Sequence, residues 1–183
     1  MEKNLNNLNN NNTNLLKLKI NLENYRIPEF RNPQYYESWI WEGDKSILPY
    51  KWIDLIKDSK IKIKDLDSNS NLDKFLKKNY YKNSDFDEKS FFFITYRSQT
   101  AGCAYLDKNN ILKFLIVSKN HLNKNIEHSL LTRALKRSLE KFDEMENGGK
   151  NKNISNRQFE IFVDLDTTNI EESFFGEFGF LKE

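Results

Sequence analysis

The chain of 183 residues lacks several features that would place it in a familiar class. Its one cysteine, Cys103, cannot form an internal disulfide and fits a reducing compartment. No apolar run approaches the roughly 20 residues that a membrane-spanning helix needs. The first residues carry neither a secretory apolar core nor an arginine-rich transit pattern. We therefore expect an intracellular, cytoplasmic protein that does not enter a membrane.

An excess of one charge and metal-binding spacings are also missing. The 29 basic and 27 acidic side chains leave a net charge of +2, which gives no attraction to nucleic acid or to an anionic membrane. The two histidines, His121 and His128, stand seven residues apart without an organised set of further ligands. We expect no metal site, and phosphate-loop, zinc-protease and CxxC patterns are absent.

Asparagine is abundant at the start of the chain. Eight of the first fourteen residues are Asn, and such a tract has too few apolar side chains to offset its ordering entropy. The prediction is a disordered tail at residues 1–14, followed by one domain at residues 15–183. A hydrophobic content of 38% with 14% aromatics is enough to build the core of that domain.

The first half of the domain gives weak structural signals. Apolar residues alternate in segments 15–20 and 25–30, so one or both are predicted strands. A helix is predicted over residues 33–40, because a proline is followed by aromatic and apolar side chains near helical spacing. A second short helix is predicted from Pro49, and a weak one over residues 72–80.

The middle of the domain gives clearer signals. Residues 90–96, 101–106 and 111–117 are apolar runs separated by turn-length segments, which predicts three strands in a meander. Residues 127–142 carry one apolar stripe at helical spacing and predict a long helix. A polar loop is predicted at residues 143–157.

The last predicted elements are a strand over residues 159–165 and a short helix over residues 169–175, which Gly179-Phe180 ends. Together the elements predict an α/β (α+β) fold. We expect a twisted, mixed, mostly antiparallel sheet that is flanked by helices.

The order strand, strand, strand, helix, strand, helix resembles the acetyl-CoA-dependent N-acetyltransferase (GNAT) superfamily. The residues that carry the resemblance are FFFITYRSQTAGCAYL at 91–106, ILKFLIVSKNHLNKNIEHSLLTRAL at 111–135, and FEIFVDLDTTN at 159–169 followed by SFFGEFGF at 173–180. They are similar to the family's second to fifth strands, its cofactor loop and its closing helix. The resemblance covers the chain from about Phe86 to the C-terminus.

The resemblance implies acetyl-CoA as the acetyl donor, held where the family's fourth and fifth strands splay apart. The splay is expected to leave backbone N–H and C=O groups at residues 115–117 unpaired, so that the pantetheine arm can bind them as a surrogate strand. The following loop would wrap the pyrophosphate with N–H groups from the helix start. The expected cofactor-binding residues are Ile116, Val117, Asn123, Lys124, Asn125, Ile126, Glu127, His128 and Asn169.

Several positions depart from the family pattern. Where the family loop has Arg or Gln, then Gly, then Gly or Ala, this chain has Leu122, Asn125 and Glu127. Asn125 can take the left-handed conformation that glycine favours. Glu127 either points outward, where it favours the helix dipole, or repels a nearby phosphate. Phe175 stands where the family often has a tyrosine that can protonate the leaving thiolate, so no catalytic residue is predicted.

The resemblance implies transfer of an acetyl group to a primary amine, of a small molecule or a protein, by direct attack without a covalent enzyme intermediate. The acceptor is expected between the N-terminal helices and the strand at residues 111–117. The alternative is a catalytically inactive relative that keeps the fold as a binding or scaffold protein. A nucleic-acid module would use a basic stripe on the long helix, for which a solvated face is the expected role: Arg133, Lys136, Arg137 and Lys141.

Overall fold

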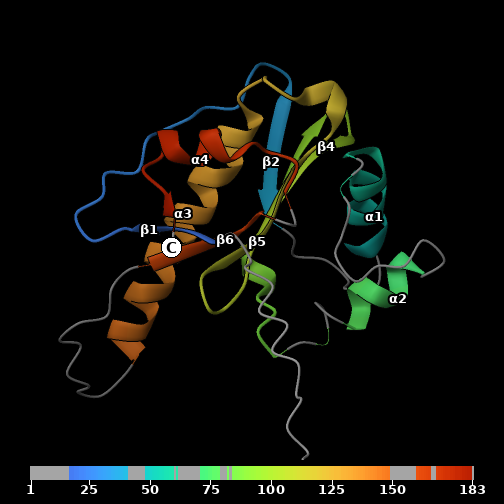
Figure 1. The fold of residues 1–183 in the computed structure, drawn as a ribbon. Helices are drawn as coiled ribbons and strands as arrows, with labels where there is room; N and C mark the ends of the chain where they lie inside the picture. Colours follow the sequence, from blue (N-terminus) through green and yellow to red (C-terminus); the bar gives the residue numbers. More distant parts are fainter. Residues whose placement is uncertain are drawn as a thin grey trace, which may run out of the picture.

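Figure 1 shows the fold in a computed structural model of the chain. The structure describes residues 17–40, 48–59, 61, 71–78, 82, 84–148, 160–165 and 168–182. The predicted asparagine-rich tail at residues 1–14 lies outside the described residues, and so do residues 149–157 of the predicted polar loop. Among the helices of the described segments, none is both long and apolar enough to cross a bilayer.

One sheet runs through the described part of the molecule, with seven strands in the order β2-β3-β4-β5-β6-β1-β7. β5 and β6 pair in parallel, and the other neighbours pair antiparallel. This confirms the predicted mixed, mostly antiparallel sheet. The strands are β1 (Lys17–Asn21), β2 (Tyr36–Ile40), β3 (Phe91–Tyr96), β4 (Gln99–Leu106), β5 (Ile111–Val117), β6 (Glu160–Asp164) and β7 (Leu181–Lys182).

The predicted meander is formed by β3, β4 and β5, which are successive neighbours in the sheet. Phe91 and Phe93 pack in the core on one face, whereas Phe92 packs in the core on the other. Burial on both faces is the reason why this strand reads as a continuous apolar run. The β3–β4 turn consists of Arg97 and Ser98, both left-handed with φ of 47° and 66°, the geometry of a two-residue hairpin.

Helices cover both faces of the sheet (Figure 1). α3 (Ile126–Gly148) and α4 (Glu172–Glu177) lie on one face, and α1 (Leu48–Ser59) and α2 (Leu72–Leu76) lie on the other. Trp52 of α1 is fully buried, with its ring 5.0 Å from Phe91 and 4.5 Å from Phe114. The predicted helices at Pro49 and at residues 127–142 are confirmed, since α1 and α3 contain them.

The predicted helix over residues 33–40 is wrong, because the structure has a strand there. β2 pairs with β3 from Tyr36↔Tyr96 to Ile40↔Phe92, so it covers the open edge of the meander. Tyr35 takes a left-handed φ of 70° at the entry to the strand. Aromatic and β-branched side chains favour strands, and pairing with β3 therefore outweighs a spacing that also fits a helix.

Other predicted bounds also change, and the weak helix predicted over residues 72–80 is the shorter α2. Of the segments 15–20 and 25–30, only the first overlaps a strand, β1, and the second has no regular structure. α3 continues six residues past Phe142, into the segment predicted as loop. Glu144 in this last part bonds to Arg137 two turns earlier, at 2.9 Å, and this ion pair favours the longer helix.

Candidate active site

The loop between β5 and α3 has the backbone geometry expected of an anion-binding loop. After β5 the chain forms the 3-10 turn η3 (Lys119–His121) and then enters α3 at Ile126. Asn123 and Asn125 are both left-handed, with φ of 59° and 61°. The expectation that Asn125 can replace a glycine conformationally is therefore confirmed. Asparagine is the non-glycine residue that tolerates this region best.

A groove of about 310 Å³ opens beside this loop, between the start of α3 and α4. It brings together four of the predicted cofactor-binding residues: Asn123, Glu127, His128 and Asn169. Of the other predicted residues, Ile116, Val117 and Ile126 are buried in the cores, and Lys124 and Asn125 are exposed in the loop. The remaining residues that line the groove are Leu122, Ile170, Glu171, Ser173, Phe174 and Glu177.

β5 and β6 splay apart, but the backbone groups beyond their pairing are not free. The two strands pair only at Ile111 and Leu112, as far as the described residues extend. Thr168 then donates its hydroxyl to the Leu115 carbonyl at 2.5 Å. Asn169 accepts from the Val117 N–H at 3.0 Å and donates to the Val117 carbonyl at 2.6 Å. The expectation of unpaired groups here is wrong, because Thr168 also forms an isolated parallel bridge with Leu115, and the Asn169 carboxamide offers the same donor and acceptor as a strand.

The groove is acidic, since three glutamates line it. Glu127 is 6% exposed, and its Oε2 has no hydrogen-bond partner among the described residues. Its Oε1 lies 3.8 Å from Nδ1 of His128, whose Nε2 lies 3.9 Å from Oε2 of Glu177. Of the two orientations left open for Glu127, the structure therefore has it buried at the groove. A diphosphate in this groove meets a carboxylate that solvent screens poorly.

Phe175 is fully buried in the core under α4, with its ring 5.7 Å from that of Phe180. A phenylalanine has no proton to donate, so this position supplies no acid for a leaving thiolate. Cys103 is likewise fully buried, and burial raises the pKa of its thiol, which keeps it protonated and unreactive. In the described segments, no group of three or more His, Cys, Asp or Glu side chains is arranged to hold a metal ion.

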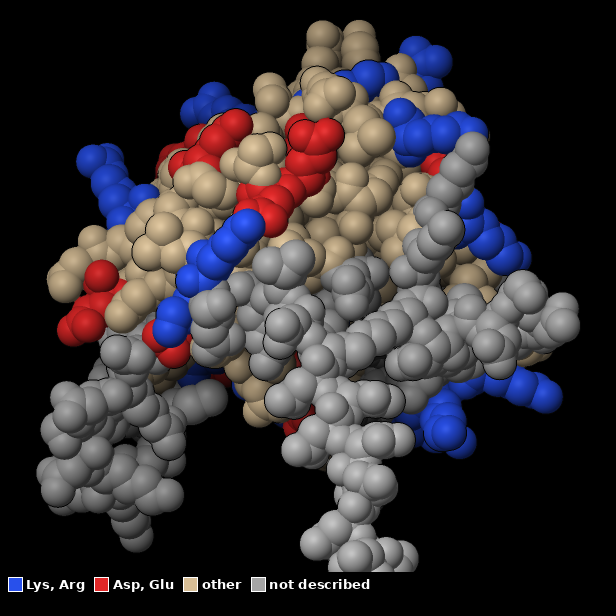
Figure 2. Space-filling view, in the orientation of Figure 1, with Lys and Arg blue, Asp and Glu red and all other residues tan. Residues whose placement is uncertain are grey.

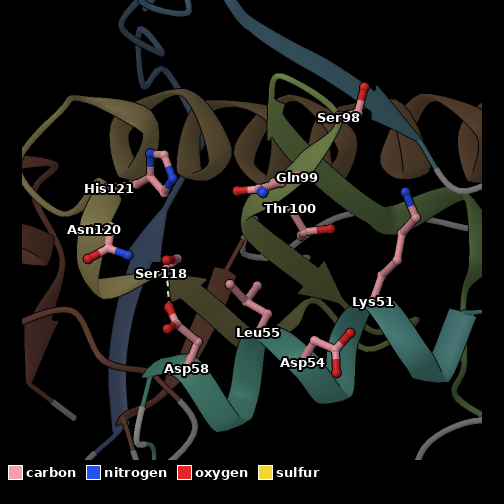
Figure 3. A pocket seen from close by; sticks show the side chains of 10 residues that line it. All are labelled: Lys51, Asp54, Leu55, Asp58, Ser98, Gln99, Thr100, Ser118, Asn120 and His121. Atoms are coloured by element: carbon pink, nitrogen blue, oxygen red, sulfur yellow. Dashed lines mark hydrogen bonds between the residues drawn. The ribbon is translucent and has the colours of Figure 1, made fainter.

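A second cavity, which we call the α1 pocket, lies on the other side of the same loop (Figure 3). It has a volume of about 410 Å³ and is formed by α1, the β3–β4 hairpin and the start of the loop after β5. The acceptor was expected between the N-terminal helices and the strand at residues 111–117; this pocket borders α1 and begins at Ser118, directly after β5. The pocket is lined by Lys51, Asp54, Leu55, Asp58, Ser98, Gln99, Thr100, Ser118, Asn120 and His121.

Two pairs of side chains organise the α1 pocket. Ser118 is buried and donates its hydroxyl to Oδ2 of Asp58 at 2.5 Å, which ties the loop to α1. Nδ1 of His121 lies 2.7 Å from the hydroxyl of Tyr36, which ties the loop to β2. Sequence reasoning gave His121 no role, because Tyr36 lies 85 residues away and on a segment predicted as helix.

The basic positions of α3 do not form the solvated face that was expected. Arg137 and Lys141 are buried. Nζ of Lys141 lies 3.1 Å from Oδ2 of Asp87, and Arg137 lies 3.8 Å from the same oxygen and 2.9 Å from Glu144. These cations are thus paired within the chain. The face drawn in Figure 2 carries both basic and acidic side chains.

Comparison with known proteins supports the fold. No family model and no curated protein sequence matches the chain. A solved structure of a GCN5-related N-acetyltransferase from Sphaerobacter thermophilus matches 92% of this chain with a TM-score of 0.53 and 11% sequence identity. The chain spans 48% of the length of that structure. The structure of PH1933 from Pyrococcus horikoshii OT3 matches 69% of this chain and 95% of its own, at 10% identity and a TM-score of 0.40.

The likeness to the Sphaerobacter structure shows that the chain has the fold of a GCN5-related N-acetyltransferase. The resemblance drawn from the sequence is confirmed at this level. At 11% identity the likeness does not extend to activity, substrate or ligand.

Proposed function

We propose that this protein is an N-acetyltransferase that moves an acetyl group from acetyl-CoA to a primary amine. The observation that carries the proposal is the loop before α3, where Asn123 and Asn125 hold left-handed conformations. This is the backbone shape that turns successive N–H groups toward one anion. It occurs at the same point of the fold at which the family binds its cofactor.

Acetyl-CoA fits this site in part. The backbone of residues 123–128 offers N–H groups for the diphosphate, and Lys124 is exposed next to them. The carboxylate of Glu127 opposes the same diphosphate. The pantetheine arm can bind along β5 only if the side chains of Thr168 and Asn169 give up their bonds to Leu115 and Val117. Binding therefore exchanges hydrogen bonds rather than adding them, which lowers the expected affinity.

Catalysis in such a site consists mainly of positioning. The amine has to be neutral and held against the thioester carbonyl, so that attack on the acyl carbon becomes effectively unimolecular. Acetyl-CoA supplies the activated acyl group when it is bound. This chain supplies the loop that holds it and, on the other side of that loop, the α1 pocket for the acceptor.

The second candidate is a binding or scaffold protein that has kept the fold without the activity. The observation that favours it is the pairing of Asn169 with both the N–H and the C=O of Val117. If those bonds are permanent, the strand surface that the pantetheine arm needs is closed.

Calorimetric titration of acetyl-CoA into the full chain distinguishes the enzyme from the binding or scaffold protein. The enzyme proposal predicts micromolar binding, with release of free thiol when a panel of primary amines is added. Asn169→Ala removes the closing side chain and should change the affinity, whereas Asn109→Ala, at the exposed β4–β5 turn, should not. If neither the wild-type chain nor Asn169→Ala binds acetyl-CoA while both remain folded, the enzyme proposal is rejected and the second candidate stands.

A further inference from the structure

The α1 pocket and the groove share one wall, the loop after β5. Asn120 and His121 line the pocket, and Leu122 and Asn123 line the groove. A ligand in the pocket and a ligand in the groove would therefore contact the same loop from its two sides. Figure 3 shows Asn120 and His121 on one side of the pocket and Lys51 and Asp54 on the other.

The imidazole of His121 is held in a fixed orientation. Its Nδ1 is bonded to the Tyr36 hydroxyl at 2.7 Å, and the Tyr36 ring stands edge-on to it at 5.6 Å and 88°. The ring of Tyr96 packs against it at 5.5 Å. Nε2 has no hydrogen-bond partner among the described residues, although the side chain lines a cavity. A fixed ring with one free nitrogen is the arrangement of a histidine that exchanges a proton.

We propose that His121 is the catalytic residue that takes the proton from the acceptor amine through Nε2, and that Tyr36 positions it. This inference rests on the proposed function for the identity of the acyl donor. It requires the tautomer in which Nδ1 carries the hydrogen and donates it to the Tyr36 oxygen, because the lone pair then lies on Nε2.

The charges around His121 suit this role. Burial lowers the pKa of His121 below its ordinary value, and the nearby charge of Lys124 acts in the same direction, while Asp58 opposes both. The ring is consequently neutral at neutral pH, ready to accept a proton. The other charged groups that line the pocket are Lys51 and Asp54 on α1.

The pocket also has acceptors for an ammonium group. Asp54 and Asp58 stand one turn apart on α1, and both line the cavity. Two carboxylates at this spacing repel each other, and a bound ammonium relieves the repulsion. A primary amine that arrives protonated can bind here before it gives a proton to His121.

The proposed step balances as follows. One N–H bond of the ammonium breaks, the proton goes to Nε2, and the electron pair stays on nitrogen. The nitrogen attacks the thioester carbon, so that a C–N bond forms and the C–S bond breaks. The thiolate leaves with its electron pair and takes the proton from His121, and the amide nitrogen loses its surplus proton to water.

Nitrogen-15 NMR of the full-length chain tests the base directly. The chain has two histidines, so His128→Gln leaves a single imidazole, that of His121, in the spectrum. We expect a neutral His121 at pH 7 with Nε2 unprotonated and Nδ1 protonated. Tyr36→Phe should keep the ring packing and lose this tautomer preference. A hydrogen on Nε2 in the otherwise native chain overturns the proposal.

A second measurement tests the acceptor. 1,4-Diaminobutane, or a short peptide with free α- and lysine ε-amines, should shift the His121 resonances, and 1,4-butanediol should not. In Asp58→Asn, the amine concentration needed for the same shift should be at least tenfold higher. No shift with either amine also overturns the proposal. Neither NMR measurement uses acetyl-CoA, so these measurements test the role of His121 alone. The calorimetric titration tests the proposed acetyl donor separately. If acetyl-CoA binds, His121→Gln should lower acetyl transfer by roughly 10²–10⁴-fold and leave donor affinity unchanged.

Discussion

Replacing Glu127 by glutamine should strengthen the binding of acetyl-CoA. The substitution removes a buried negative charge from the groove and keeps the size and shape of the side chain. It also gives a hydrogen-bond donor to a position where Oε2 now has no partner among the described residues. Because the diphosphate of the donor is anionic, loss of the charge favours the bound state.

The size of the effect follows from the burial of Glu127. Two like charges about 4 Å apart repel by roughly 1 kcal/mol in bulk water and about 4 kcal/mol at an effective dielectric of 20. Glu127 is 6% exposed, so its surroundings are nearer to the second case. Since about 1.4 kcal/mol corresponds to a factor of ten, the affinity should increase by a factor between roughly five and several hundred.

Calorimetry of acetyl-CoA against wild type and Glu127→Gln at two salt concentrations measures this effect. Glu177→Gln is the matched control, because that carboxylate lines the same groove but its side chain is 69% exposed. Its removal should change the affinity by less than about fivefold, and the change should shrink as salt increases. Equal affinities for wild type and Glu127→Gln, with both folded, would refute the placement of the diphosphate at the start of α3.

Three further predictions concern stability. Lys141→Met should destabilise the fold by about 3 kcal/mol in urea unfolding, because Asp87 loses its nearer buried ion-pair partner, at 3.1 Å, and keeps Arg137 at 3.8 Å. Lys136→Met, at an exposed position, should change the stability by less than about 0.5 kcal/mol. Although burial opposes it, hydrogen bonding and the charge of Lys141 hold the pKa of Asp87 below its ordinary value. The stability it contributes is therefore present above pH 4 and lost as the pH falls through the lowered pKa, and Asp87→Asn should flatten that part of the pH profile. Gly102→Ala should lower stability by about 1–3 kcal/mol in thermal unfolding, because the added Cβ would lie 3.0 Å from both a backbone oxygen of β5 and a side chain of α3; Gly176→Ala, with nothing within 4 Å, should raise it by up to about 1 kcal/mol.

Local patterns predicted the elements whose burial follows from their own sequence. β3 and β5 are continuous apolar runs, and the stripe of α3 repeats at helical spacing over several turns. β2 was misread because the segment YESWI satisfies both a strand and a helix. Its state is decided by pairing with β3, more than fifty residues later in the chain, and no short window contains that information.

In the candidate site, too, features set by the local sequence could be predicted and features set by long-range contacts could not. The left-handed backbone at Asn125 could be predicted, because it follows from the residue type and the position in the loop. The bonds of Asn169 to Val117 span 52 residues, and the bond of His121 to Tyr36 spans 85. Each depends on the finished sheet, so neither has a signal in the sequence around it.

The side chains of Thr168 and Asn169 have a consequence for the protein without any ligand. A splayed sheet exposes one edge of β5, and an exposed edge is a template on which another chain can add a strand and begin to aggregate. By bonding to Leu115 and Val117, these two side chains cover that edge from within the same chain. These bonds should therefore limit strand exchange between copies of the protein.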